Sequence, residues 1–158
     1  MRKQITRAET KRFPSDDFQN WLDLEQLVQI ELTSEDSAHP IESALINDAG
    51  SGWRAQQPGK QVIRLLFDKP HRISRIQLIF QEDARARTQE FVLRWSQDPG
   101  TSYREIVRQQ YNFSPPAVTR ELEEYVVDLD GLTMLELDII PDISGGETRA
   151  SLAQLRLA

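Results

Sequence analysis

The chain of 158 residues contains no cysteine, only two histidines and no long apolar run. The lack of cysteine excludes disulfides, thiolate metal sites, iron–sulfur clusters and thiol catalysis. No segment approaches the roughly 20 apolar residues that a membrane-spanning helix needs. Residues 1–12 begin with basic side chains but do not continue into the apolar stretch of a secretory signal. We therefore expect a cytoplasmic protein that does not enter a membrane.

The scarcity of histidine also limits catalysis. His39 precedes Pro40 and His71 follows Pro70, so both histidines are expected in surface turns. A nucleophilic triad or a histidine-rich metal site has few residues from which to form. The 25 acidic residues include no pair that stands out as a candidate for glycoside hydrolysis. We therefore predict that the chain is not an enzyme.

Charge is unevenly distributed along the chain, although the net charge is only −6. Residues 1–12 contain five basic side chains and one acid, so the remaining residues contain 14 basic and 24 acidic side chains. Contacts between basic side chains and phosphates are the main source of affinity for nucleic acids. An acidic body of this kind argues against a nucleic-acid partner.

Apolar and polar residues alternate with a period of two along most of the chain, which is the pattern of half-buried β-strands. The alternation predicts eight strands, at residues 27–32, 61–67, 73–80, 90–96, 104–111, 124–129, 134–140 and 151–157. In the strand at 134–140, for example, leucine and isoleucine are expected inward, with Glu136 and Asp138 outward. Helix is expected only within residues 1–30. Longer loops are expected at 33–60, 81–89, 112–123 and 141–150. Eight strands at this spacing favour an all-β sandwich or barrel.

Four sets of motifs narrow this prediction. In order along the chain they are Pro40–Asp48 with Gly52-Trp53-Arg54-Ala55, Gln61–Pro70 with Ile73–Ile76, Glu90–Ser96 with Asp98 and Gly100, and Ala150–Leu157. Their order and spacing resemble the discoidin family, also called coagulation factor V/VIII C-type domains, and the related family-32 carbohydrate-binding modules. The resemblance implies an eight-stranded antiparallel jelly-roll sandwich of the galactose-binding kind over residues 27–158, after a polar lead-in over residues 1–26. In such a domain Trp53 is expected in the core, as is Trp95 from its alternating strand.

The resemblance also bears on calcium, which many carbohydrate-binding members of the family hold near an early Asp-Gly pair and a glutamate in the last strand. This chain has Asp48-Ala49 at the first position and the neutral Gln154 at the second. Calcium prefers several oxygen ligands that together carry negative charge. We therefore predict no cofactor and no metal site.

The densest charged loop of the body, residues 81–90, supplies the first candidate ligand residues, Glu82, Arg85 and Arg87. A guanidinium group presents planar, forked donors that suit sugar hydroxyls and carboxylates. The alternative is structural: Arg87 pairs with Glu82 or Glu90 and holds the loop.

The segment Tyr111-Asn112-Phe113 supplies the other candidates. Aromatic rings beside an amide can hold a sugar between an apolar surface and hydrogen-bonding groups. The alternative is again structural, because Tyr111 and Phe113 could close the end of the sandwich.

Two functions remain open at this point. The first is a non-catalytic module that binds a carbohydrate or a similar polar ligand through the loops at one end of the jelly roll. The second is an intracellular docking module that binds another protein and no sugar.

Overall fold

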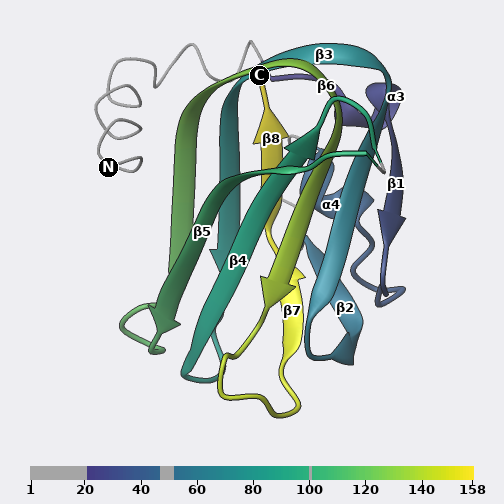
Figure 1. Ribbon diagram of the computed structural model, residues 1–158. Helices are drawn as coiled ribbons and strands as arrows, with labels where there is room; N and C mark the ends of the chain where they lie inside the picture. Colours follow the sequence, from purple (N-terminus) through teal and green to yellow (C-terminus); the bar gives the residue numbers. More distant parts are fainter. Residues whose placement is uncertain (1–20, 47–51, 100) are drawn as a thin grey trace.

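The computed structural model describes residues 21–46, 52–99 and 101–158 (Figure 1). Residues 1–20 of the expected polar lead-in over residues 1–26 lie outside the described residues, as does the Asp48-Ala49 pair. No helix in the described ranges is long and apolar enough to cross a membrane.

Eight strands and two short helices make up the described part of the chain. In chain order they are α3 (Leu24–Leu27), β1 (Val28–Leu32), α4 (Glu42–Leu45), β2 (Trp53–Pro58), β3 (Gln61–Gln81), β4 (Arg87–Ser96), β5 (Arg104–Phe113), β6 (Arg120–Ile140), β7 (Arg149–Leu152) and β8 (Gln154–Leu157). The named strands all pair in antiparallel fashion. The prediction of an all-β antiparallel sandwich is therefore confirmed.

The two layers are joined by β3 and β6, which are long enough to run through both. The first part of β3 pairs with β1 and with the last part of β6, whereas the second part pairs with β8 and with the first part of β6. The register between them shifts near His71 and Ile73, where both strands bend over the top of the molecule in Figure 1. β4 and β5 extend the first layer, and β2 pairs with β7.

The core lies between these layers and contains the residues that the period-two pattern placed inward. From β3 and β6 it takes Ile63, Leu65, Ile76, Leu78, Phe80, Leu135, Leu137 and Ile139, and from β4 Phe91, Leu93 and Trp95. Trp53 is also buried, and its Nε1 donates a hydrogen bond to the Ser34 carbonyl oxygen at 3.2 Å. Both tryptophans are thus core residues, as expected.

Several element boundaries differ from the prediction. The segments 61–67 and 73–80 belong to one strand, and so do 124–129 and 134–140, although the register between the two strands shifts between Leu66 and Arg75. The last segment divides into β7 and β8. β2 lies inside the expected loop 33–60, and α4 lies beyond residue 30, where helix was not expected.

Glu136 and Asp138 were predicted to face solvent, but both are buried. Arg94 contacts both carboxylates, at 3.3 Å and 2.7 Å, and Arg64 contacts Glu136 at 2.8 Å. The aliphatic parts of these arginines cover the outer face of the sheet while their charged ends pair with the acids. The outward direction was right, and the arginine neighbours account for the burial.

Candidate functional site

The two loops that carry the predicted ligand residues lie at the same end of the sandwich, opposite the bends of β3 and β6 (Figure 1). The Glu82 amide in the β3–β4 loop donates a hydrogen bond to the Thr119 carbonyl in the β5–β6 loop at 2.8 Å. The Thr88 hydroxyl on β4 bonds to the Asn112 side-chain oxygen on β5 at 2.6 Å. The structure therefore brings the two predicted segments together.

Arg87 lacks the accessible surface that a ligand residue needs, because only 5% of the residue is exposed, and the structural alternative of a pair with Glu82 is confirmed. Its Nε donates to Glu82 at 2.6 Å, and its Nη1 donates to the Pro141 carbonyl at 2.6 Å and to Gln89 at 3.2 Å. A buried guanidinium needs hydrogen-bond acceptors, and these three satisfy its Nε and Nη1 donors. Arg87 is therefore a structural residue that holds the loop to β4 and to the chain after β6.

Phe113, the aromatic candidate of the second segment, is also buried, with 2% of its surface exposed. Its ring lies beneath the Arg87 guanidinium at 4.7 Å and contacts the Tyr111 ring at a centroid distance of 5.0 Å. Tyr111 is only partly buried, and its hydroxyl donates to the Arg120 carbonyl at 2.8 Å. Phe113 thus closes the end of the sandwich, as the structural alternative proposed.

The other predicted residues keep accessible surface. Arg85 and Asn112 are exposed, and Glu82 is partly exposed. Burial by itself would raise the pKa of Glu82, but hydrogen bonds from Arg87 and from the amides of Ala84 and Arg85 together lower it below its ordinary value. A role for Glu82, Arg85, Tyr111 and Asn112 in ligand binding stays a prediction.

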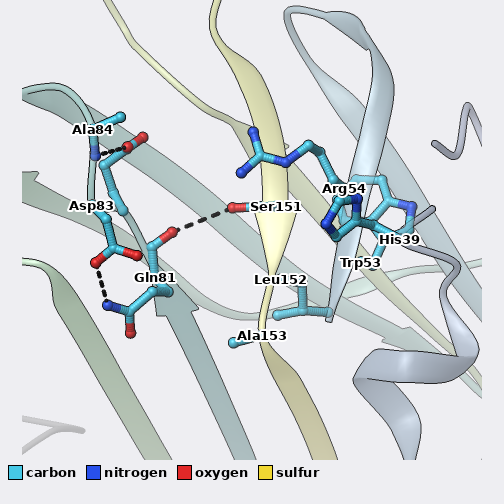
Figure 2. A pocket seen from close by; sticks show the side chains of 10 residues that line it. His39, Trp53, Arg54, Gln81, Asp83, Ala84, Ser151, Leu152 and Ala153 are labelled. Atoms are coloured by element: carbon cyan, nitrogen blue, oxygen red, sulfur yellow. Dashed lines mark hydrogen bonds between the residues drawn. The ribbon is translucent and has the colours of Figure 1, made fainter. Parts of the chain in front are cut away.

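A pocket of about 190 Å³ opens beside these loops, and only Glu82 of the predicted ligand residues lines it. Figure 2 shows two walls, with His39, Trp53 and Arg54 on one side and the β3–β4 loop from Gln81 to Ala84 on the other. Residues 151–153 of the β7–β8 segment lie between them. The Ser151 hydroxyl is 3.5 Å from the Gln81 carbonyl oxygen, which joins the floor to one wall.

The wall formed by His39 and Arg54 is fixed by backbone hydrogen bonds. The Arg54 amide donates to the His39 carbonyl at 3.1 Å, and the Asp36 amide donates to the Arg54 carbonyl at 2.9 Å. The Ala38 amide donates to the Asp36 carboxylate at 3.0 Å, and this bond, together with His39 at 3.6 Å, lowers the Asp36 pKa. The backbone here is therefore ordered, while the Arg54 side chain is exposed and makes no ion pair or hydrogen bond with any described residue.

The opposite wall is acidic. The Asp83 carboxylate accepts a hydrogen bond from the Gln81 side chain at 2.8 Å, and the Glu82 carboxylate is held by Arg87 and two backbone amides. The pocket therefore places a guanidinium and an imidazole opposite carboxylates, with a hydroxyl between them. Such a set can donate to and accept from several hydroxyl groups of one small ligand.

Sequence reasoning missed the pocket residues His39, Arg54, Asp83 and Ser151. It assigned His39 to a surface turn and placed Arg54 in a long loop. Arg54 was already part of the Gly52-Trp53-Arg54-Ala55 motif. The signal that could have found it is its position directly beside the buried Trp53 in an alternating segment, since alternation places successive side chains on opposite faces of a strand.

The residues around Gln154 do not fit a calcium ion. In one orientation the Gln154 amide donates to the Ile46 carbonyl at 3.4 Å, and in the other it accepts from Arg156 Nη2 at 2.8 Å. A neutral amide beside a guanidinium supplies no negative charge for a hard cation. Within residues 21–46, 52–99 and 101–158, no group of three or more histidines and acids is placed to hold a metal.

Comparison with known proteins gives one family match and several structural matches. The sequence profile of the F5/8 type C domain matches residues 29–128. No curated protein matches the sequence.

The structural matches are all distant in sequence. A family 32 carbohydrate-binding module of C. perfringens NanJ in complex with galactose is 12% identical, with a TM-score of 0.64, 87% of this chain covered and 96% of that one. CpGH89CBM32-5 from Clostridium perfringens, in complex with GalNAc-β-1,3-galactose, is 17% identical, with a TM-score of 0.65 and coverage of 87% and 99%. A pectin-binding module is 17% identical, with a TM-score of 0.61 and coverage of 84% and 90%. These matches show that the chain has the jelly-roll fold of such modules.

Proposed function

Because the chain belongs to the F5/8 type C domain family, we propose that it is a non-catalytic binding module whose pocket between Arg54 and the β3–β4 loop holds a carbohydrate. The observation that carries the proposal is the Arg54 side chain, which lines the pocket without a partner among the described residues. Arginine is usually paired or solvated, and a free guanidinium that lines a concave polar surface can bind the ligand directly.

The size and chemistry of the pocket favour a small polyhydroxylated ligand. Its volume of about 190 Å³ is below the roughly 300–1,000 Å³ of pockets for drug-sized molecules. One sugar ring is a ligand of suitable size. Arg54 and His39 supply donors, Asp83 supplies acceptors, and Ser151 supplies both, as a ring with several hydroxyl groups requires.

The same geometry argues against catalysis at this pocket. Glu82 is held by Arg87 and by backbone amides, and its lowered pKa makes it a poor proton donor near neutral pH. The imidazole of His39 lies 3.6 Å from the Asp36 carboxylate, within the turn that fixes this wall. The structural matches named as carbohydrate-binding modules support binding as the role of the fold.

The experiment compares two exposed arginines at the same end of the molecule. A glycan array with the purified chain identifies a bound sugar, and calorimetry with that sugar, or with galactose and galacturonic acid, measures its affinity. Arg54→Ala is expected to weaken binding about 10-fold or more, the cost of losing one good charged hydrogen bond. Arg85→Ala is the matched control, because Arg85 lies in the β3–β4 loop but does not line the pocket. We expect this control to bind within about 2-fold of the wild type.

Two results would contradict the proposal. A loss of affinity in Arg85→Ala with none in Arg54→Ala would move the site to the residues that the sequence predicted. Failure of every sugar on a broad array would argue against carbohydrate as the ligand.

A further inference from the structure

The outer edge of β1 is open. Among the described residues β1 pairs only with β3, and Figure 1 shows it at the margin of the sheet. The Thr33 amide donates to the Val62 carbonyl at 3.1 Å and the Val62 amide donates to the Thr33 hydroxyl at 3.1 Å, so Thr33 and Val62 form a bonded pair across the two strands. Because such pairs alternate along an antiparallel ladder, the peptide groups of Ile30 and Leu32 point away from β3. These groups can receive a further strand.

A groove of about 400 Å³ runs beside this edge, between β1 and the two short helices. Its apolar lining is Val28, Ile30, Leu32, Ile41 and Leu45. The three β1 side chains are only partly buried, although they face the core side of the strand. An additional strand at this edge could cover them with its own apolar residues while its backbone pairs with β1.

The rim of the groove is acidic. Glu25, Glu35 and Glu42 line it, and all three are exposed. Glu35 accepts a hydrogen bond from the Ile41 amide at 2.7 Å and so also holds the start of α4. Glu25 and Glu42 make no side-chain hydrogen bond or ion pair with any residue that the structure describes. Two free carboxylates therefore stand beside an apolar surface and an open strand edge.

We propose that this β1 groove binds an extended segment of a partner protein in which basic and apolar residues alternate, added to the sheet as a strand beside β1. Alternate side chains of the added strand would share one face, so its apolar residues can cover the groove lining while the basic residues between them remain free to reach the acidic rim. The β1 groove shares no lining residue with the pocket proposed for carbohydrate. The two sites can therefore be occupied independently.

The acidic charge of the rim favours a basic segment over a second copy of the chain as the occupant of the groove. Glu25 and Glu42 lie on α3 and α4 at the rim of the groove, so a second copy seated on this edge would bring a second acidic rim near the first. Like charges that are brought close together repel each other. A basic segment replaces this repulsion with attraction, which also speeds association at low salt.

The test uses the full chain labelled with ¹⁵N and two synthetic peptides, one of alternating lysine and valine and one of alternating glutamate and valine. We expect the lysine peptide to shift the amide signals of Ile30 and Leu32 and to slow their hydrogen exchange, with little change at Arg54. The glutamate peptide should leave these signals unchanged. Raising the salt concentration should weaken the binding of the lysine peptide, because the rim charges are exposed.

A charge reversal gives the sharper comparison. The double variant Glu25→Lys/Glu42→Lys should lose affinity for the lysine peptide by about 10-fold or more and gain it for the glutamate peptide. Asp130→Lys/Glu147→Lys is the matched control, with the same change in net charge at exposed positions outside the groove. It should behave as the wild type does.

Three outcomes would overturn the inference: equal binding of both peptides, amide shifts that do not include β1, or an equal effect of the two double variants. Self-association of the wild-type chain that protects Ile30 and Leu32 would also overturn it, in favour of a second copy as the occupant. None of these results depends on whether Arg54 binds a sugar.

Discussion

At the scale of single residues, the loop end depends on one buried guanidinium. Arg87 contacts Glu82, Gln89 and the Pro141 carbonyl, and it covers the Phe113 ring. Its contacts thus join the β3–β4 loop, β4, β5 and the chain after β6. The pocket wall at Glu82 keeps its shape because Arg87 holds that carboxylate from behind.

Loss of the Glu82 carboxylate should destabilise the fold. Glu82→Ala removes the ion-pair partner of the buried Arg87, and leaving a buried donor without its acceptor costs about 1–3 kcal/mol. Because the folded-state pKa of Glu82 lies below its unfolded value, its contribution is fully present above the unfolded pKa, and is lost as the pH falls through the folded pKa. Urea unfolding should therefore show a large difference between wild type and variant at pH 7 and a much smaller one in strong acid.

The adjacent carboxylate supplies the control for this experiment. Asp83 is exposed and, among the described residues, accepts a hydrogen bond only from the nearby Gln81 side chain. Asp83→Ala should change the free energy of unfolding by less than about 0.5 kcal/mol. A similar loss of stability in both variants would show that the Arg87 ion pair is not what holds the loop.

The residue types at the loop end were predictable, but their exposure was not. The sequence places Arg85 and Arg87 two positions apart in one charged loop, and it left open whether Arg87 binds a ligand or pairs with Glu82 or Glu90. Arg87 differs from Arg85 because its guanidinium donates a hydrogen bond to the Pro141 carbonyl, 54 positions further along the chain. Arg54 can be identified as a pocket residue only from the fold, which places β2 opposite the β3–β4 loop.

At the scale of elements, the pairing of β2 with β7 forms part of the pocket. Trp53 is opposite Leu152 and Arg54 is opposite Ser151, so this register sets the distance between wall and floor. Gly52, immediately before β2, has a φ of +78°. A Cβ atom at this position would lie 2.5 Å from the Leu152 carbonyl oxygen. A side chain there would force β2 away from β7.

Two glycine substitutions can distinguish the cost of this steric clash from the cost of backbone strain. Gly52 and Gly59 both have positive φ, but a Cβ atom at Gly59 would meet nothing within 4 Å. Gly59→Ala should cost about 1–2 kcal/mol, the strain of the left-handed conformation. Gly52→Ala should cost about 1–3 kcal/mol more, because it also overpacks the β2–β7 pair. Thermal and urea unfolding measure both values, and equal losses would show that β7 moves aside without cost.

The period-two alternation identified most strands. It failed at the start of β6, where the buried face carries glutamates and the exposed face carries apolar residues. Glu121 and Glu123 of β6 are buried, whereas Leu122 and Val126 on the opposite face are exposed. The predicted strand began at residue 124, because two glutamates on the inward face contradict an apolar core. They are tolerated there because Gln89 donates to Glu121 at 3.3 Å and the Tyr125 hydroxyl donates to Glu123 at 2.8 Å. Burial and the nearby Glu123 raise the pKa of Tyr125, so its hydroxyl remains a donor.

At the scale of the whole molecule, β3 and β6 make the two layers one cooperative unit. Each layer contains one part of both strands, so neither layer can open without disturbing the same hairpin. Small domains of this kind usually unfold in a single transition. The continuity of the two strands, which the sequence divided into four segments, is the physical reason to expect it here.

Native-state hydrogen exchange can measure this coupling. The amides of Leu65 and Leu78 belong to the two parts of β3, one in each layer. Both should exchange with the same free energy of opening, equal to the global value from urea unfolding. A clearly lower value for Leu78 alone would mean that the layer of β8 opens by itself.

The hydrogen bond between the Leu22 amide and the Leu157 carbonyl, 2.8 Å long, places the two ends of the described domain side by side. The C-terminus lies at the end where β3 and β6 bend, and the β3–β4 loop lies at the opposite end (Figure 1). A domain with adjacent ends can be inserted into a loop of another protein with little distortion of its host. Any polypeptide joined beyond Ala158 would leave from the end away from the β3–β4 loop. That wall of the pocket would then be presented outward, toward whatever the tethered domain meets.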